Sequence, residues 1–512
     1  MAEVKHRWAT RWEALAMAGV FILALTHRLE RLGTRNLWQD EAYSLDLARR
    51  NIPELLAFLR GNDAHPLGYY AMLHFWIRVF GEDLARMRAL SVLFGLAAIL
   101  LTWRLGRRLF SPAVGVGAAA LLALNPFQIF ASNELRMYMP VEFLALLSTW
   151  ILWRARESDG GYAWWTVYGA SVALMGYYSY YAFLLVPAHA LWIFLHRTPR
   201  HTVRHYAVAA LTAVVLYAPW ISYLMLPAAL VRGNLLTLRG QTLWPTYLPE
   251  LFLSQTFGGY LFDMITYHTT QGLDPKYYGI FLFPFVVLVT AGASALGWIN
   301  KPARSLIALS WIVPVLLVVL ASLAFGKVYA YHYHLNFLQP FLALFLAAGV
   351  VYLREAVARA PGALVTLGAI VAILVFVAPA VDNLQWNPDY WSYRYDRAAR
   401  LVKDLYKPDD VVIYLPTGVR RGFSFYFKPP GREMDIPVTS QRWSKEALQE
   451  SIHQAAESLT SEDRRVWLVF SEPLPEGAVE DVIAVIQQQG YRLAIVNDFK
   501  GLRVGLLVRP VR

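Results

Sequence analysis

Residues 86–108 read RMRALSVLFGLAAILLTWRLGRR, and this stretch decides the fold class. Its central part, from Ala89 to Trp103, holds no charged residue and is bounded by arginines on both sides. A hydrocarbon core about 30 Å thick requires about 20 apolar residues in a helix. The stretch therefore predicts a membrane-spanning helix over 86–103 that ends in the basic residues Arg104, Arg107 and Arg108.

Similar apolar runs recur along the first three quarters of the chain. With the first stretch they lie near 13–29, 86–103, 113–131, 137–153, 162–179, 181–196, 205–225, 277–299, 305–325, 335–353 and 362–381, which makes about eleven spans by the hydropathy rule. Of 512 residues, 57% are hydrophobic and 16% charged, against about a quarter charged in a soluble domain. The sequence predicts a polytopic α-helical membrane protein, whose first run lacks a cleavage site and is a retained helix.

The connections between these spans fall into two sets that differ in charge. The basic set contains Lys5, Arg7, Arg11, Arg104, Arg107, Arg108, Arg154, Arg156, Arg197, Arg200, Arg204, Lys301, Arg304, Arg354 and Arg359. The other short connections, near 125–136 and 326–334, hold only Arg136 and Lys327. The positive-inside rule places the basic set and the N-terminus in the cytoplasm. We therefore expect the long connections 30–85 and 226–276, and the C-terminus, to be extracytoplasmic.

Residues 382–512 differ in character from the rest, because charged residues become frequent and long apolar runs stop. Strand-like runs begin at Val411, Phe423, Val466, Arg492 and Leu502, and polar helical stretches lie near 395–406, 444–458 and 477–489. This alternation predicts a small α/β domain. The predicted organisation is a transmembrane domain over 1–381, with outer loops 30–85 and 226–276, and an extracytoplasmic α/β domain over 382–512.

Charge and cysteine content exclude several classes of function. The formal charge is +11, but the basic residues flank apolar segments instead of forming a stripe, which favours a topological role over nucleic-acid binding. Cysteine is absent, so disulfides, thiolate metal sites and a cysteine nucleophile are excluded.

The first outer loop holds two groups of candidate functional residues. Trp38-Gln39-Asp40-Glu41 brings two adjacent carboxylates to a membrane surface, where one can serve as a base and the other can position it. Asp40 can equally cap the helix that follows, and the two roles can coexist. Further on, His65-Pro66-Leu67-Gly68-Tyr69-Tyr70 opens an aromatic helix, 66–80, which is too short to span and is expected to lie in the outer interface. His65 at its N-terminus can bind phosphate or form only local hydrogen bonds.

Two further groups lie in short outer connections. Arg136 stands in Asn133-Glu134-Leu135-Arg136-Met137-Tyr138 and can pair with Glu134 or with a phosphate. The segment 327–334, KVYAYHYH, can hold a phosphate or diphosphate, or can anchor the chain in the interface. Its His332 and His334 form a weak metal signal, because no carboxylate accompanies them.

The order W-x-D-E, H-P-L-G-Y-Y and E-x-R-M-Y resembles the polyprenyl-phosphate-sugar-dependent membrane glycosyltransferases with the GT-C fold. Relatives of this family include the protein O-mannosyltransferases and the lipid A aminoarabinose transferases, and the resemblance covers about the first 350 residues. Two departures concern the sugar or carrier contacts. Leu67 follows Pro66 where mannosyltransferases usually have H-P-P, and His332-Tyr333-His334-Leu335 stands where many relatives read R-Y-L-x-P.

The resemblance implies an inverting transfer of a sugar from a polyprenyl-phosphate donor to an acceptor hydroxyl at the outer face. Asp40 would act as general base, with Glu41 orienting Asp40 or the acceptor. The donor phosphate would be bound by His65, Arg136, Lys327, His332 and His334, and the acceptor or sugar by Tyr43, Glu134 and Tyr138. No cofactor is required, and a divalent metal is a minor alternative.

The expected partners are the polyprenyl-phosphate-sugar donor, a lipid, glycan or protein acceptor, and the lipid bilayer, with no nucleic acid. Two other functions stay open at this point. A transporter or flippase for an amphiphile would require ionisable groups within the spans, and His189 is the most obvious mid-span polar residue. A glycan ligase or polymerase would also act at the outer face.

Overall fold

The computed structural model describes residues 2–30, 32–62, 65–158, 161–196, 201–224, 302–326, 330, 332–357, 393–416, 418–436, 445–471 and 477–510. The chain divides into two compact units. Unit 1 comprises Met1–Leu32 and Arg50–Trp386, and unit 2 comprises Gly33–Arg49 and Asn387–Arg512. The segment 33–49, which was expected to belong to the transmembrane domain, therefore clusters with the C-terminal residues.

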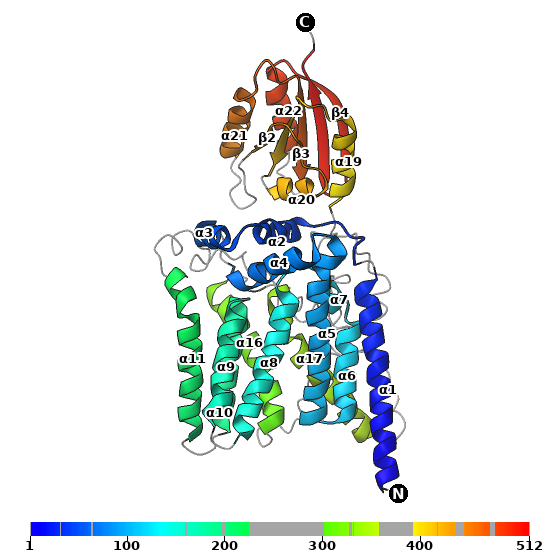
Figure 1. The fold of residues 1–512 in the computed structure, drawn as a ribbon, viewed down its shortest axis with the longest axis vertical. Coiled ribbons are helices and arrows are strands. Elements are labelled where there is room, and N and C mark those ends of the chain that lie inside the picture. Colours follow the sequence, from blue (N-terminus) through cyan, green and yellow to red (C-terminus); the bar gives the residue numbers. More distant parts are fainter. Residues whose placement is uncertain are drawn as a thin grey trace. The chain divides into compact units, whose positions relative to one another are not determined.

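Unit 1 is helical throughout its described part (Figure 1). Its helices are α1 (Ala2–Leu29), α3 (Ile52–Asn62), α4 (Leu67–Phe80), α5 (Leu84–Leu109), α6 (Pro112–Leu124), α7 (Pro126–Ser132), α8 (Tyr138–Glu157), α9 (Tyr162–Gly176), η1 (Tyr180–Leu184), α10 (Leu185–Leu195), α11 (His201–Leu224), α16 (Pro302–Phe325), η2 (His332–Leu338) and α17 (Gln339–Val357). Every predicted span within the described residues contains a helix. The predicted spans 277–299 and 362–381, and the loop 226–276, lie outside the described residues.

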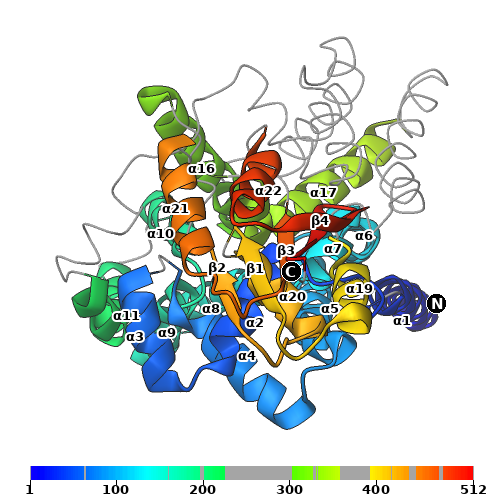
Figure 2. The same cartoon turned by 90° about the horizontal axis from the view of Figure 1, so that it is seen from above.

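Length and hydropathy identify the membrane-spanning character of this unit. In the described part, five helices are long and apolar enough to cross a membrane, or six if the bent pair α6 and α7 is counted as one span. The α1 and α11 helices lie at opposite edges of the bundle (Figure 2). The α3 and α4 helices lie across the end of the bundle opposite the N-terminus (Figure 1). The chain is thus a multi-pass membrane protein.

The predicted single span 113–131 is broken, because α6 and α7 meet at an angle of 66°. Pro126 cannot donate a backbone hydrogen bond, and the Asn125 side chain caps α7 by accepting from the backbone N–H of Phe127 at 2.9 Å. The break leaves carbonyl groups at the end of α6 without partners inside the helix. Arg28 of α1, which is fully buried, donates to the carbonyls of Leu122 and Ala123 at 3.0 and 3.1 Å. The bend is therefore stabilised by a buried guanidinium.

Unit 2 contains α2 (Gln39–Arg49), α19 (Tyr395–Leu405), β1 (Val411–Leu415), α20 (Gly418–Tyr426), β2 (Glu433–Asp435), α21 (Lys445–Glu457), β3 (Arg465–Ser471), α22 (Ala478–Gln488), β4 (Arg492–Phe499) and β5 (Leu502–Val508). The strands form one sheet in the order β2-β1-β3-β5-β4. The β1 strand is parallel to β2 and β3, whereas β5 is antiparallel to β3 and β4.

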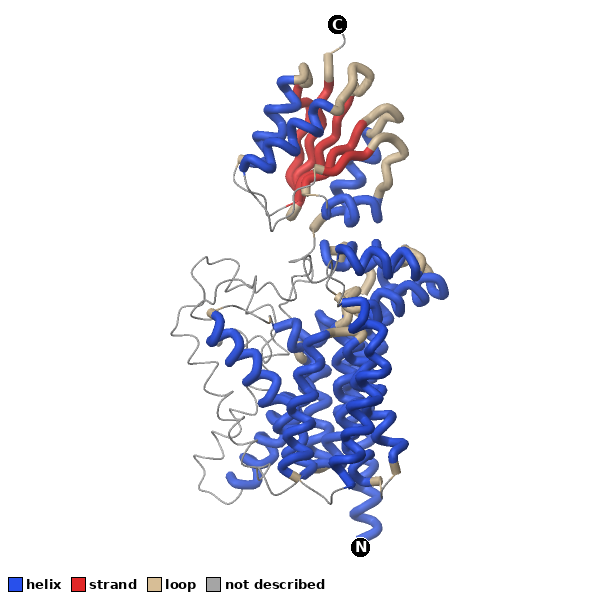
Figure 3. Tube along the Cα trace, turned by 90° about the vertical axis from the view of Figure 1, so that its left-hand side faces the viewer, coloured by secondary structure: helices blue, strands red, loops and turns tan. Residues whose placement is uncertain are grey.

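Alternate residues of β1 supply the two cores of unit 2. Val411 and Ile413 pack in one core with residues of α21 and α22, and Val412 and Tyr414 pack in the other with residues of α19 and α20. The sheet therefore has helices on both faces, as Figure 3 shows. This alternation is the period-2 pattern of a strand buried on both faces.

One predicted strand of this unit is wrong, because the run that begins at Phe423 is the end of helix α20. Val419 and Phe423, four residues apart, are both buried in the same core, which is the spacing of one helix face. The aromatic composition of the run favoured a strand, but the periodicity of burial is helical. The short strand β2 was not predicted.

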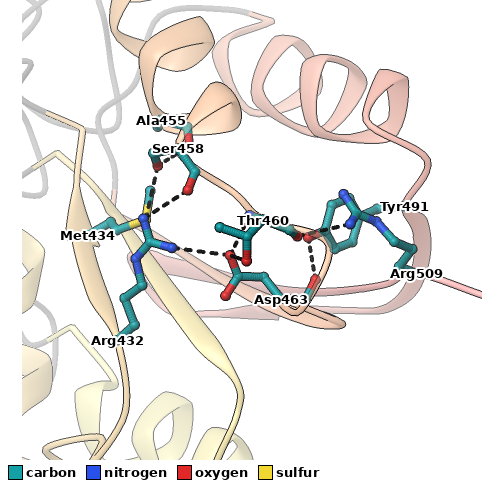
Figure 4. A network of polar contacts seen from close by, with 8 residues as sticks. All are labelled: Arg432, Met434, Ala455, Ser458, Thr460, Asp463, Tyr491 and Arg509. Atoms are coloured by element: carbon teal, nitrogen blue, oxygen red, sulfur yellow. Dashed lines mark hydrogen bonds and ion pairs between the residues drawn. The ribbon is translucent and has the colours of Figure 1, made fainter.

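The turn between α21 and β3 is held by a network of polar contacts (Figure 4). Arg432 donates to the carboxylate of Asp463 at 3.1 Å and to the carbonyl of Ser458 at 2.9 Å. The hydroxyl of Tyr491 donates to the carbonyl of Asp463, and the guanidinium of Arg509 lies 4.4 Å from the Tyr491 ring centroid. This network lies at the start of β3. Because β1 is parallel to β3, β1 begins at the same end of the sheet.

Candidate functional site

The W-x-D-E motif opens helix α2 in unit 2. Glu41 is fully buried, and its Oε1 lies 3.1 Å from Nη2 of Arg35, which is 3% exposed. Its Oε2 accepts a hydrogen bond of 3.3 Å from the backbone N–H of Trp38, the residue before the helix. A glutamate at the third helical position that bonds back to the N-cap is the reciprocal half of a capping box. Glu41 therefore holds the start of α2 and balances a buried cation.

Asp40 lies beside Glu41 in a different environment. It occupies the second position of α2 and is half-buried. Asp40 lies inside the helix, so it does not occupy the N-cap position expected for it. The two carboxylates of the motif are thus divided between a buried structural position and a partly exposed one.

The segment 33–38 that leads into α2 is bound to α19 and α20. The Asn36 amide donates to Oδ1 of Asp396 at 2.6 Å, and its Oδ1 accepts from the Tyr426 hydroxyl at 3.1 Å. The same hydroxyl accepts from the backbone N–H of Leu37 at 3.0 Å. Asp396 also accepts two hydrogen bonds from Arg394, at 2.9 and 2.8 Å.

The pKa of Asp396 reflects these contacts. Partial burial alone would raise the pKa of this carboxyl, but hydrogen bonds from Arg394 and Asn36 outweigh that effect and lower it.

The α2 helix makes further contacts with α20. The Arg421 guanidinium lies 4.8 Å from the Tyr43 ring centroid and 3.5 Å from the Asp46 carboxylate. Tyr43, predicted to bind the acceptor or sugar, therefore contacts an arginine of the α/β domain.

In unit 1, His65 is half-buried and lies just before α4, whose N-cap is Pro66. The backbone N–H of Gly68 donates to the carbonyl of Tyr177 at 2.8 Å. A Cβ atom at Gly68 would lie 2.6 Å from that carbonyl oxygen, so the contact requires glycine. The H-P-L-G sequence thus seats the start of α4 against the turn between α9 and η1.

The E-x-R-M-Y motif lies between α7 and α8. Glu134 is fully buried, Arg136 is 6% exposed and Tyr138 is 7% exposed. The Ser91 hydroxyl of α5 donates to the backbone carbonyl of Glu134 at 2.6 Å, which ties this loop to the start of α5. The loop therefore presents a largely buried guanidinium at the end of the bundle where α4 also lies.

An aromatic chain links this loop to the predicted His-rich segment. The Tyr138 and Tyr333 ring centroids are 5.9 Å apart, those of Tyr333 and His334 are 4.4 Å apart, and His334 stacks on Tyr181 at 4.5 Å. Tyr181 belongs to η1, which follows the turn that contacts Gly68. The contacts therefore join Tyr138, Tyr333, His334 and Tyr181, and the backbone bond of Gly68 adds the start of α4, which follows His65. Lys327 lies outside the described residues, as does the side chain of His332, although its backbone begins η2.

Sequence reasoning missed a buried polar cluster next to these aromatic residues, formed by side chains of α7, α8 and η2. Gln128 of α7 donates to Oε2 of Glu142 at 2.7 Å and to Oδ1 of Asn336 at 3.1 Å, and Asn336 donates to the same Glu142 oxygen at 2.8 Å. Glu142 is fully buried. An acidic residue inside an apolar run was the available signal, because such residues are costly and usually functional. The cluster fixes η2, and with it His334, against α7 and α8.

His189, the predicted mid-span polar residue, contacts hydroxyl groups of two neighbouring helices. Its two ring nitrogens lie 3.2 Å from the Thr149 hydroxyl and 2.9 Å from the Tyr168 hydroxyl. Such contacts join α8, α9 and α10 and satisfy a buried imidazole. Within the described ranges, no group of three or more histidine, aspartate or glutamate side chains is arranged to hold a metal ion.

Comparison with known proteins gives one matching family model and several structures with a similar fold. Residues 64–223 match the family model described as dolichyl-phosphate-mannose-protein mannosyltransferase. The fold is similar to that of ArnT from Cupriavidus metallidurans in the apo state, with 15% identity, a TM-score of 0.60, and 97% of this chain and 98% of that chain covered. The same protein bound to undecaprenyl phosphate gives 14% identity, a TM-score of 0.61, and the same coverage.

A second fold relative is the archaeal oligosaccharyltransferase AglB from Archaeoglobus fulgidus, in complex with an inhibitory peptide and a dolichol-phosphate. It shares 10% identity with a TM-score of 0.58, over 97% of this chain and 74% of that chain. ArnT and AglB both have the GT-C fold. This chain therefore has the GT-C fold. No curated protein matches its sequence.

The segment that matches the family model includes His65, Arg136 and Tyr138. It does not include Asp40 or His334. The roles of these individual residues therefore rest on the geometry of this chain.

Proposed function

We propose that this protein is a glycosyltransferase that moves a sugar from a polyprenyl-phosphate donor to an acceptor hydroxyl, with inversion and with Asp40 as general base. The observation that carries the proposal is that the two carboxylates of the W-x-D-E motif have different environments. Glu41 is committed to Arg35 and to the helix start, whereas its neighbour Asp40 is partly exposed at the helix N-terminus. Two adjacent carboxylates in different environments are typical of sites in which one positions and the other reacts.

In this mechanism Asp40 takes the proton of the acceptor hydroxyl while that oxygen attacks the anomeric carbon of the donor. The bond between that carbon and the phosphate oxygen breaks, and polyprenyl phosphate leaves with the bonding electrons. One displacement from the opposite face inverts the configuration. The structures of ArnT with undecaprenyl phosphate and of AglB with a dolichol-phosphate support this class of carrier.

The leaving phosphate requires cationic and hydrogen-bonding groups that are already in place. His65 lies just before α4, a helix whose N-terminal N–H groups favour an anion. Arg136 presents a guanidinium that can form two parallel hydrogen bonds with a phosphate. His334 joins the same end of unit 1 through its stack on Tyr181. We assign His65, Arg136 and His334, together with Lys327 and His332, to the donor phosphate, and Glu134 and Tyr138 to the sugar or acceptor.

Charge supports an extracytoplasmic site. Arg108 donates to Glu157 at 2.9 and 2.7 Å, which places the ends of α5 and α8 together, and Arg104, Arg107, Arg154 and Arg156 are near those ends. This basic end of the bundle is opposite the end crossed by α3 and α4 (Figure 1). The positive-inside rule then assigns the basic end to the cytoplasm and α4 to the outer interface.

The experiment that tests the base is single-turnover sugar transfer by purified Asp40→Asn protein, with donor binding measured in parallel. Loss of a general base typically lowers the rate by about 10²–10⁴-fold. We expect that loss with donor affinity unchanged, since Asn keeps the shape of the side chain. Arg136→Ala should instead weaken donor binding, because it removes a guanidinium assigned to the donor phosphate. Near-normal transfer by Asp40→Asn would remove Asp40 as the base.

A further inference from the structure

The segment that bears Asp40 is built into the α/β domain. Residues 33–49 cluster with the C-terminal residues although they are separated from them by more than 300 positions. Asn36 and Asp396, which share a hydrogen bond of 2.6 Å, are 360 residues apart in the sequence. The α/β domain therefore contacts the W-x-D-E segment directly.

The contact is specific because it uses both ends of one amide. Asn36 is 8% exposed. Its NH₂ group donates to Asp396, and its carbonyl oxygen accepts from Tyr426. The Tyr426 hydroxyl also accepts from the backbone N–H of Leu37, so it bonds both the side chain of Asn36 and the backbone of the next residue. We name Asn36, Asp396 and Tyr426 the loop clamp.

Close packing supports the clamp on the next turn of the chain. Gly418, the first residue of α20, packs beside the Gln39 side chain, whose Nε2 lies 2.7 Å from the position that a Cβ atom at Gly418 would take. Leu37 is fully buried. Arg421 adds a half-exposed contact to Asp46. The segment on the N-terminal side of Asp40 is thus held by three hydrogen bonds and by the burial of Leu37.

We propose that the α/β domain is the positioning element for the catalytic base, and that the loop clamp holds Asp40 in its reactive orientation. The inference rests on the proposed function, because it takes Asp40 as the base. The clamp residues are positioning residues, since they act on Asp40 through the segment that precedes it. A misplacement of about 1 Å can cost about 10²-fold in rate, so a loosened clamp lowers turnover without weakening donor binding.

The test compares turnover and donor affinity in the full-length protein. Tyr426→Phe removes the hydroxyl that holds Leu37 and Asn36, and we expect kcat to fall about 10- to 100-fold with the donor Kd unchanged. Tyr491→Phe is the matched control. It also removes a phenol hydroxyl of the α/β domain, but this hydroxyl donates to Asp463 in the turn between α21 and β3, and the change should leave kcat within about twofold. A fall in donor affinity equal to the fall in kcat, or an unchanged kcat, would overturn the proposal.

An exchange of groups separates positioning from general damage to the domain. Asn36→Asp alone sets two carboxylates at a contact that now measures 2.6 Å, and it should lower kcat at least as far as Tyr426→Phe. Asn36→Asp combined with Asp396→Asn returns an amide and a carboxylate to the pair and should recover most of that loss. Failure of the double variant to exceed the single one would show that the pair does not act by direct contact, and would refute the clamp.

The Asp40→Asn background distinguishes this inference from the proposed function. If the clamp acts through Asp40, Tyr426→Phe should have little further effect on the residual rate of Asp40→Asn. An undiminished effect of Tyr426→Phe in that background refutes the clamp while leaving Asp40 as the base. Near-normal transfer by Asp40→Asn alone refutes the base, and the clamp as its positioning element with it.

Discussion

Glu41→Gln is the substitution whose effect the structure defines most sharply. It removes one charge and keeps the shape of the side chain. Glu41 is fully buried and pairs at 3.1 Å with Arg35, which is 3% exposed. The amide can still accept from the backbone N–H of Trp38, so the capping contact survives. What changes is that the Arg35 guanidinium loses its buried counter-charge.

The expected magnitude follows from burial. Removing one partner of a buried ion pair costs about 3–5 kcal/mol, because the other charge is left uncompensated. Glutamine retains a hydrogen-bond acceptor, so we expect a value near 3 kcal/mol, which opens α2 about 100-fold more often. Asp46→Asn on the same helix makes the same chemical change to a partly exposed pair, 3.5 Å from Arg421. It should cost less than about 1 kcal/mol, or about fivefold.

Hydrogen exchange of the backbone amides in α2, followed by mass spectrometry on the purified protein, measures this opening directly. Glu41→Gln should exchange about 100-fold faster across α2, and Asp46→Asn less than about fivefold faster. Replacing both buried partners, with Arg35→Met and Glu41→Leu, should return exchange toward the wild-type rate, because apolar pairs often substitute for buried ion pairs. Equal exchange in Glu41→Gln and Asp46→Asn would refute the argument from burial.

Three further predictions concern helix seating, pH and orientation. Gly68→Ala should lower thermal stability by about 1–3 kcal/mol, because its Cβ meets a carbonyl oxygen; Gly161→Ala, with open space around it, is the control. The lowered pKa of Asp396 means that its stabilising contribution is present above about pH 4 and lost below it. The stability difference between wild-type and Asp396→Asn protein should therefore narrow as the pH falls toward 3, and a constant difference would contradict this. Lys403→Cys should react with an impermeant reagent from outside and Tyr162→Cys only after the membrane is opened; the reverse pattern would invert the topology.

Much of the fold was predictable because hydropathy is a property of consecutive residues. The apolar run between Ala89 and Trp103 has to be a helix in a bilayer, since only a helix satisfies its backbone within one segment. The described spans accordingly contain helices where the sequence predicts them. The exception at Asn125 and Pro126 also has a local cause, but Arg28, which donates to the carbonyls at the end of α6, comes from another helix.

The identity of the candidate residues was likewise visible in the sequence, because Asp40, His65 and Arg136 are polar groups at the ends of apolar segments. Their environments were not. Adjacent letters in a motif cannot show that Glu41 is buried against Arg35 while Asp40 is partly exposed. That difference depends on which faces of α2 other residues cover.

Contacts between distant segments were decided by the tertiary structure alone. His334 stacks on Tyr181, and Glu142 joins Gln128 and Asn336 in one buried cluster, although nothing in the local sequence pairs them. The same holds for Asn36 and Asp396, 360 residues apart. The sequence by itself determined that this chain crosses the membrane and which polar groups stand at its surface, because partition between water and lipid acts on each segment separately. Only the tertiary structure decided that the segment bearing Asp40 belongs with the α/β domain, because hydrogen bonds and close packing form between segments that folding brings together.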